Sequence, residues 1–162
     1  MRTRCGRLTF AVSIGAICAL ILLSQGAAFA QEKDPLIGTW NFTGANADGT
    51  GPFIAVMTFN LGGTTVEYDT GGTNASAGES ISLGKWSKTD HLAYQFKEQN
   101  YIYDSSGNLS LIAITGCKVT LASTLKQVGG TCESKFYQCS VSQCPGILLF
   151  GPVALTLNGR RF

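Results

Sequence analysis

Short alternating runs of apolar and polar residues, separated by turn residues, make up the chain from residue 36 onward. No stretch of a dozen residues there repeats apolar positions at the spacings that an amphipathic helix requires. Runs rich in β-branched and aromatic residues, bounded by Gly, Asn, Asp and Ser, are typical of strands. The sequence predicts strands at 37–43, 53–60, 64–69, 82–88, 91–98, 100–104, 108–115, 117–124, 128–137 and 152–158, and some of these are expected to merge.

The connections between these strands are short and rich in turn residues, as in "ADGTG" at 47–51 and "DSSGN" at 104–108. Local connections favour strands that run up and down beside their chain neighbours. We therefore expect an all-β fold, a single antiparallel up-and-down β-barrel of 8–10 strands in one domain spanning residues 31–162. The longest irregular stretch is expected at 138–151.

Within the predicted strands, large side chains recur at every second position and so share a face. Pairs of this kind are Trp40 with Phe42, Met57 with Phe59, Tyr94 with Phe96 and Tyr101 with Tyr103. Small barrels either fill their interior with such side chains or enclose one ligand between them. If there is a ligand cavity, the residues predicted to line it are Phe53, Met57, Phe59, Tyr68, Tyr94, Phe96, Tyr101 and Tyr103.

The first thirty residues have the pattern of a signal peptide. A basic start is followed by an uncharged stretch from 8 to 30, which ends in the small residues "AFA". We expect cleavage after Ala30, a secreted or periplasmic location, and no stable membrane insertion of the mature chain. An uncleaved membrane anchor is the alternative, because the uncharged run is just long enough to span a bilayer.

Cleavage would change the charge of the chain. It would remove three of the twelve Lys and Arg residues and none of the ten Asp and Glu residues, which leaves a net charge near −1. Because no basic stripe remains, we expect no nucleic-acid partner and no polybasic membrane-binding patch. A closed barrel also leaves no free strand edge, so a monomer is expected.

Four of the six cysteines follow the predicted cleavage site. In an exported protein an even number of cysteines indicates disulfides, and four allow three connectivities. We favour Cys117 with Cys132, across a hairpin, and Cys139 with Cys144, around the loop "SVSQ". These spacings do not form the paired knuckles of a structural zinc site, so no metal is expected.

The segment "LIGTWNF" at 36–42 resembles the opening strand of the calycin superfamily, the lipocalins and their relatives. In that family the tryptophan of the G-x-W motif plugs the closed end of the barrel, and an arginine from a late strand lies across it. The terminal "LNGRRF" offers Arg160 or Arg161 for a cation–π contact with Trp40. The resemblance therefore implies a structural role for these three residues.

More specifically, "GTW", "MTFNLGG", "LGKWSK", "YQF" and "NGRRF" together resemble small exported bacterial proteins with a lipocalin-like barrel. The resemblance spans nearly all of the mature chain, through short motifs, and it implies a fold without a specific ligand. The chain lacks the later lipocalin signatures and any C-terminal helix pattern. Avidin-like barrels also begin with G-x-W, but Trp40 and Trp86 are too few for an aromatic biotin box.

No catalytic residue or cofactor is assigned, because the chain has no phosphate-binding loop, HExxH or GxSxG motif. The sole histidine, His91, follows the turn "KTD" and is expected to be solvated, with haem ligation a less favoured alternative. Glu67 and Asp69 share a strand face, and Glu98 and Asp104 flank "QNYIY". Carboxylates brought together inside a barrel could exchange protons with a ligand.

These observations predict a barrel that binds a small apolar or aromatic molecule. One alternative is a structural or interaction module with a filled barrel, whose cavity would be below the roughly 300 Å³ of a ligand pocket and whose contact surface would be the loop 138–151. Another is an enzyme acting on an enclosed ligand, which would need at least two polar side chains converging in the cavity.

Overall fold

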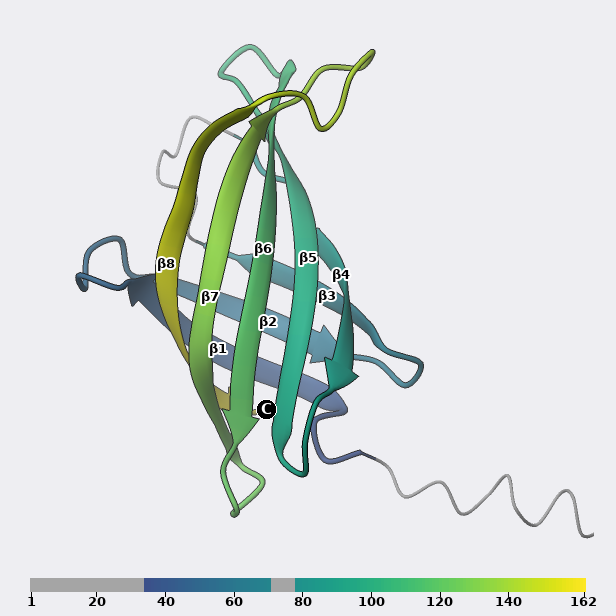
Figure 1. The fold of residues 1–162 in the computed structure, drawn as a ribbon, viewed down its shortest axis with the longest axis vertical. Helices are drawn as coiled ribbons and strands as arrows, with labels where there is room; N and C mark the ends of the chain where they lie inside the picture. The colour runs from purple at the N-terminus through teal and green to yellow at the C-terminus, as the bar shows by residue number, and fades with distance from the viewer. Residues whose placement is uncertain (1–33, 71–77) are drawn as a thin grey trace, which may run out of the picture. The chain divides into compact units, whose positions relative to one another are not determined.

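The computed structural model describes residues 34–70 and 78–162, and in these residues the fold is entirely β (Figure 1). Eight antiparallel strands follow one another around a closed barrel, each hydrogen-bonded to its chain neighbours, and the last pairs with the first. The predicted fold class is confirmed. The strands are β1 (Gly38–Asn46), β2 (Phe53–Phe59), β3 (Thr64–Asp69), β4 (Ser82–Lys88), β5 (Ala93–Tyr103), β6 (Leu109–Leu121), β7 (Gln127–Gln138) and β8 (Leu148–Arg161).

Ten predicted strands become eight because two pairs of them merge. The predicted strands 91–98 and 100–104 form one strand, β5, and 108–115 and 117–124 form one strand, β6. Pairing at eleven positions between β5 and β6 keeps both strands extended along their length. The local sequence pattern does not show this pairing. The predicted irregular stretch 138–151 is also shorter than expected, because β7 includes Gln138 and β8 begins at Leu148.

Turn chemistry explains the tight connection between β5 and β6. The Asp104 side chain accepts hydrogen bonds from the backbone N–H groups of Ser106 and Asn108, both at 2.9 Å. Gly107 has a φ of 79°, in the left-handed region where a glycine meets no side-chain penalty. This turn and the loop between β7 and β8 lie at the same end of the barrel, the upper end in Figure 1.

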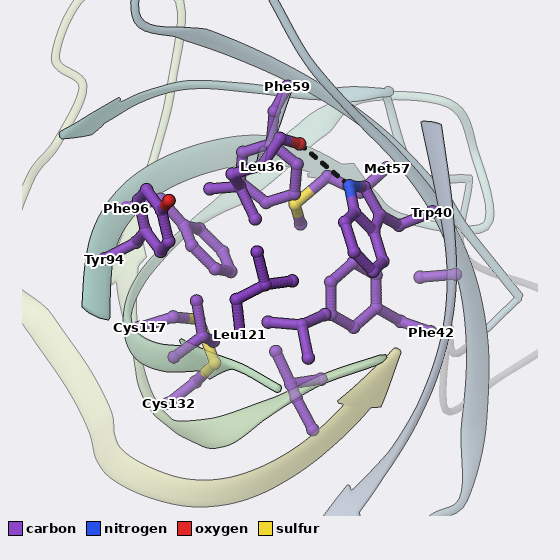
Figure 2. Close-up of a cluster of buried hydrophobic side chains, with 14 residues drawn as sticks. Leu36, Trp40, Phe42, Met57, Phe59, Tyr94, Phe96, Cys117, Leu121 and Cys132 are labelled. Carbon is purple, nitrogen blue, oxygen red and sulfur yellow. Dashed lines mark hydrogen bonds between the residues drawn. A yellow bond between two sulfur atoms is a disulfide. The ribbon is translucent and has the colours of Figure 1, made fainter. Parts of the chain in front are cut away.

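The opposite end of the barrel is closed by Trp40, whose side chain has no exposed surface. Its indole Nε1 donates a 2.9 Å hydrogen bond to the carbonyl oxygen of Leu36, drawn as a dashed line in Figure 2. The Arg161 guanidinium lies 4.7 Å from the centre of the Trp40 ring and donates to the carbonyl oxygens of Ile37 and Pro35. Of the two arginines that the resemblance offered, Arg161 makes the contact, and Trp40 is a structural plug.

Aromatic rings pack above this plug and complete what we call the closed end. Phe59 lies edge-on to Trp86 and Phe96, with ring centres 6.1 and 5.5 Å apart, and Trp86 lies edge-on to Tyr94 at 5.9 Å. Edge-to-face pairs at these distances add to the gain from burial. The closed end therefore contains three of the four pairs that the alternating pattern placed on common faces, and the fourth pair, Tyr101 with Tyr103, lies outside it.

Both predicted disulfides are present. Cys117 and Cys132 occupy directly opposed positions on β6 and β7, with Cα atoms 4.0 Å apart, and their side chains point into the barrel (Figure 2). Cys139 and Cys144 close the loop between β7 and β8. Disulfides form and persist in oxidising compartments, so this pair of bonds suits an extracytoplasmic protein. The predicted signal peptide lies outside the described residues.

Candidate functional site: a cavity with one acidic wall

A cavity of about 530 Å³ lies within the end of the barrel opposite Trp40. We call this end the open end. The Cys117–Cys132 disulfide and Leu157 belong both to the hydrophobic core and to the cavity lining, so they form its floor. Exposed residues such as Phe150 and Glu79 line its mouth. The two halves of the interior differ because small or polar side chains, among them Thr115 and Ser134, take inward positions in this half.

One wall of the cavity is apolar and comes mainly from β6, β7 and β8. At its rim the rings of Phe136 and Phe150 stack with centres 4.3 Å apart and planes inclined by 14°. Large apolar area on a concave surface is what a small organic ligand buries. The other apolar residues of this wall are Ile102, Leu111, Val153 and Leu155.

The facing wall is acidic. Glu67 and Asp69 come from β3, Glu79 from the segment before β4, and Glu98 from β5. Asn100 donates a 3.3 Å hydrogen bond to Glu79 Oε2 across this wall. We call Glu67, Asp69, Glu79 and Glu98 the acidic wall.

Glu67 and Glu98 meet although 31 positions separate them in the chain. Glu67 is opposite Ser82 on β4, and Glu98 is opposite Gly84 on the same strand, so β4 brings the two carboxyls together. Gly84 is essential to this approach, because a Cβ there would lie 2.5 Å from Thr65 Oγ1 and 2.7 Å from the Cβ of Glu98. The two carboxyl groups hydrogen bond to each other, and Ser82 also bonds Glu67.

Burial sets the protonation of this pair. Glu67 is 7% exposed and Glu98 is 6% exposed. Burial raises the pKa of Glu98 well above its ordinary value, and repulsion from Glu67 and their shared hydrogen bond raise it further. The pKa of Glu67 is also raised by burial, while hydrogen bonds from Glu98 and Ser82 oppose that rise. Burial and mutual repulsion thus favour retention of a proton by this carboxyl pair.

One carboxyl oxygen of Glu98 accepts no hydrogen bond. Glu98 Oε2 is fully buried and has no hydrogen-bond partner within the described residues. Leaving a buried polar atom without a partner is costly, and such atoms are rare in folded proteins. Within the described residues, Thr65 Oγ1 is also buried without a partner, and Thr65 pairs with Gly84 on the side of β4 opposite to Glu98.

The eight residues predicted to line a cavity are distributed over three environments. Phe53 lines the cavity. Tyr68 and Tyr101 are 67% and 36% exposed on the outer face, and Tyr103 follows a register shift at the end of β5 without lining the cavity. The remaining four, Met57, Phe59, Tyr94 and Phe96, are buried in the closed end.

Two physical facts account for this distribution. Alternation tells which residues share a face, but not which face of the strand points inward. Nor does it tell where along the barrel axis a residue lies, which depends on the stagger between strands. Tyr68 thus alternates with the inward-facing Glu67 and Asp69 and points outward.

Sequence reasoning had marked Glu67, Asp69 and Glu98 as carboxylates that a barrel could bring together, and all three line the cavity. It had also marked Asp104, which instead caps the turn after β5. Glu79, Asn100 and most of the apolar wall were missed. A usable signal was present for Glu98, because it follows Tyr94 and Phe96 in the same two-residue phase.

A reactive histidine, a metal site or a membrane-spanning helix in the described residues would each indicate a further function. His91 is exposed in the hairpin between β4 and β5, away from the cavity. No three His, Cys, Asp or Glu side chains in residues 34–70 and 78–162 are arranged to hold a metal ion. Nor does that part of the chain contain a helix long and apolar enough to cross a membrane.

No protein-family model, curated protein or solved structure matches this chain.

Proposed function

We propose that this protein is an extracytoplasmic, lipocalin-like binding protein that encloses one small, largely apolar or aromatic molecule. The cavity of about 530 Å³ carries the proposal. Pockets for small organic ligands typically measure about 300–1,000 Å³ and are lined mainly by apolar side chains with a few polar groups. The volume exceeds the roughly 300 Å³ below which the filled-barrel alternative would hold.

The two disulfides support a location outside the cytoplasm, and the fold is compatible with the lipocalin-like resemblance. A packed closed end also suits a carrier, because it holds the barrel rigid while the open end receives the ligand. Preorganisation of this kind lowers the cost of ordering protein groups on binding.

Filling the cavity tests the proposal. Ala113 lines the cavity from β6, and Ala113→Trp would place a large side chain within it. Lys118→Trp adds the same side chain to an exposed position of the same strand and is the matched control. The probe is N-phenyl-1-naphthylamine, an uncharged fluorophore that brightens in apolar surroundings.

The wild type and Lys118→Trp are expected to bind the probe, and Ala113→Trp is expected to lose most of that binding. Equal binding by all three proteins would place the probe elsewhere and contradict the proposal, as would no binding to the wild type. Native mass spectrometry of the exported wild-type protein would then identify any molecule that it retains.

An enzyme acting on an enclosed ligand is the second candidate, because Glu67 and Glu98 are polar side chains that converge beside the cavity. Burial raises the pKa of both carboxyl groups, so the pair can hold a proton for transfer to a ligand, as a general acid does. This candidate predicts that a bound molecule is recovered with altered mass after incubation, whereas a carrier returns it unchanged.

A further inference from the structure

We infer that the molecule bound in this cavity carries a basic nitrogen, held as an ammonium group against Glu98 and Glu67, with its aromatic or aliphatic body against the apolar wall. The inference rests on the proposed binding function and deepens it, because it names the chemical class of the ligand.

The charge distribution of the cavity is the first argument. The lining includes four carboxyl groups and no Lys, Arg or His side chain. A buried carboxylate is normally paired with a cation. The described lining residues include no Lys, Arg or His, so a cationic ligand would offset the negative charge of Glu67 and Glu98.

The unpartnered oxygen of Glu98 is the second and independent argument. Oε2 is a buried acceptor on a side chain that is 6% exposed, and Glu98 is among the residues that line the cavity. The Glu98 carboxyl group also shares a hydrogen bond with Glu67. An acceptor in this position calls for a donor, and an ammonium group offers up to three N–H donors from one atom.

The surroundings of Glu98 favour that donor over an alcohol or an amide. The titratable groups facing Glu98 are Glu67 and Asp69 on β3 and Glu79 before β4. On the β6 side it faces Thr115, which is uncharged, while Cys117 is held in a disulfide and does not titrate. Every titratable group among the described residues that line the cavity is thus an acid, and each ionised acid adds attraction for a cation.

Two other classes of ligand are disfavoured by the same residues. A divalent metal ion would need several oxygen ligands in one shell, and the described residues contain no group of three candidate ligands arranged for one. A fatty acid or another carboxylate would place negative charge against the acidic wall. The pairing of an acidic wall with the stacked Phe136 and Phe150 instead fits a molecule with a cationic head and an apolar body.

Three indole compounds with different charges separate these possibilities. Tryptamine is a cation at pH 7.5, tryptophol is neutral, and indole-3-propionate is an anion, while their ring systems are the same. Isothermal titration calorimetry of the mature protein is expected to show that tryptamine binds at least about tenfold more tightly than tryptophol. The reason is that hydrogen bonds involving charged groups are stronger than those between neutral groups. Indole-3-propionate is expected to bind more weakly than either.

Glu98→Gln removes the carboxyl group with little change of shape, and Glu133→Gln removes an exposed carboxylate of β7 as the matched control. Glu98→Gln is expected to reduce the preference for tryptamine over tryptophol to less than about threefold while retaining tryptophol binding, because a bound cation favours ionisation of the carboxyl pair and Gln cannot ionise. Glu133→Gln is expected to keep the wild-type preference. If Glu98→Gln failed to fold, as judged by its circular dichroism spectrum, the three wild-type affinities would still decide the question.

Each outcome bears on a different claim. Equal binding of the three indoles, or tightest binding of the anion, would overturn the inference and leave the proposed function intact. So would a wild type that binds N-phenyl-1-naphthylamine and not tryptamine. A wild type that binds neither the fluorophore nor any indole would refute the proposed function itself, and the inference with it.

Discussion

The two ends of the barrel are built from the same eight strands but hold side chains of different size and polarity. At the closed end, inward positions carry Trp40, Phe59 and Tyr94, and each is about 1% exposed or less. At the open end, the same alternation places Thr115, Ser134 and the acidic wall inward, beside a cavity of about 530 Å³. The same alternation of inward and outward residues can therefore form either a packed core or a cavity. The size of the inward side chains decides which of the two forms.

Truncation at the closed end is expected to have the largest effect on stability. Trp40→Ala removes a fully buried side chain, its hydrogen bond to Leu36 and its contact with Arg161. We expect a loss of about 3–5 kcal/mol in the free energy of unfolding, as for other buried Trp and Phe truncations.

Leu111→Ala at the open end is the counterpart. Leu111 is half-buried and already faces the cavity, so its removal leaves fewer lost contacts, and we expect a loss of less than about 2 kcal/mol. Urea unfolding followed by circular dichroism would measure both variants. A similar loss in both would mean that the open end is packed as tightly as the closed end.

Removal of the disulfide at the boundary between the two ends is expected to have the next largest effect on stability. The double variant Cys117→Ala/Cys132→Ala opens a link across 15 positions, and the loop-entropy relation assigns about 3 kcal/mol to a loop of that length. Cys139→Ala/Cys144→Ala opens a link across 5 positions outside the barrel wall and is expected to cost less. Thermal unfolding would rank them, and the reverse ranking would contradict this account.

The pH dependence of stability is expected to show the smallest effect, and it arises at the open end. The pKa of Glu98 is raised in the folded state, so the folded protein retains a proton that the unfolded chain releases. Stability therefore falls as the pH rises from the ordinary glutamate pKa through the raised pKa of Glu98. Glu98→Gln removes this group and is expected to flatten the decline, whereas Glu133→Gln should leave it unchanged.

Urea unfolding at several pH values between 4 and 9 would measure this dependence. A wild type whose stability rises over that range would show that Glu98 is ionised and paired in the folded protein. The closed end offers no comparable titration, because the buried hydrophobic cluster there contains no carboxyl group. The pH test therefore probes one end of the barrel alone.

Much of the closed end was predictable from the sequence, and most of the open end was not. The motif around Trp40, three of the four alternating pairs and the cysteine spacings are local signals, and each corresponds to an observed structural feature. By contrast, the apolar wall combines residues of β5 to β8 that have no shared local pattern. Its members come together through strand stagger around the closed barrel.

Local sequence by itself determined which residues share a face of a strand, because side chains alternate along any extended chain. It also favoured the observed disulfide partners among three possible connectivities, and the resemblance of the segment around Trp40 implied its buried position. Only the tertiary structure decided which face pointed inward and that Glu67 would meet Glu98. Their contact depends on the register of β3, β4 and β5 and on the absence of a side chain at Gly84, and no local pattern contains the spacing between strands that the closed barrel imposes.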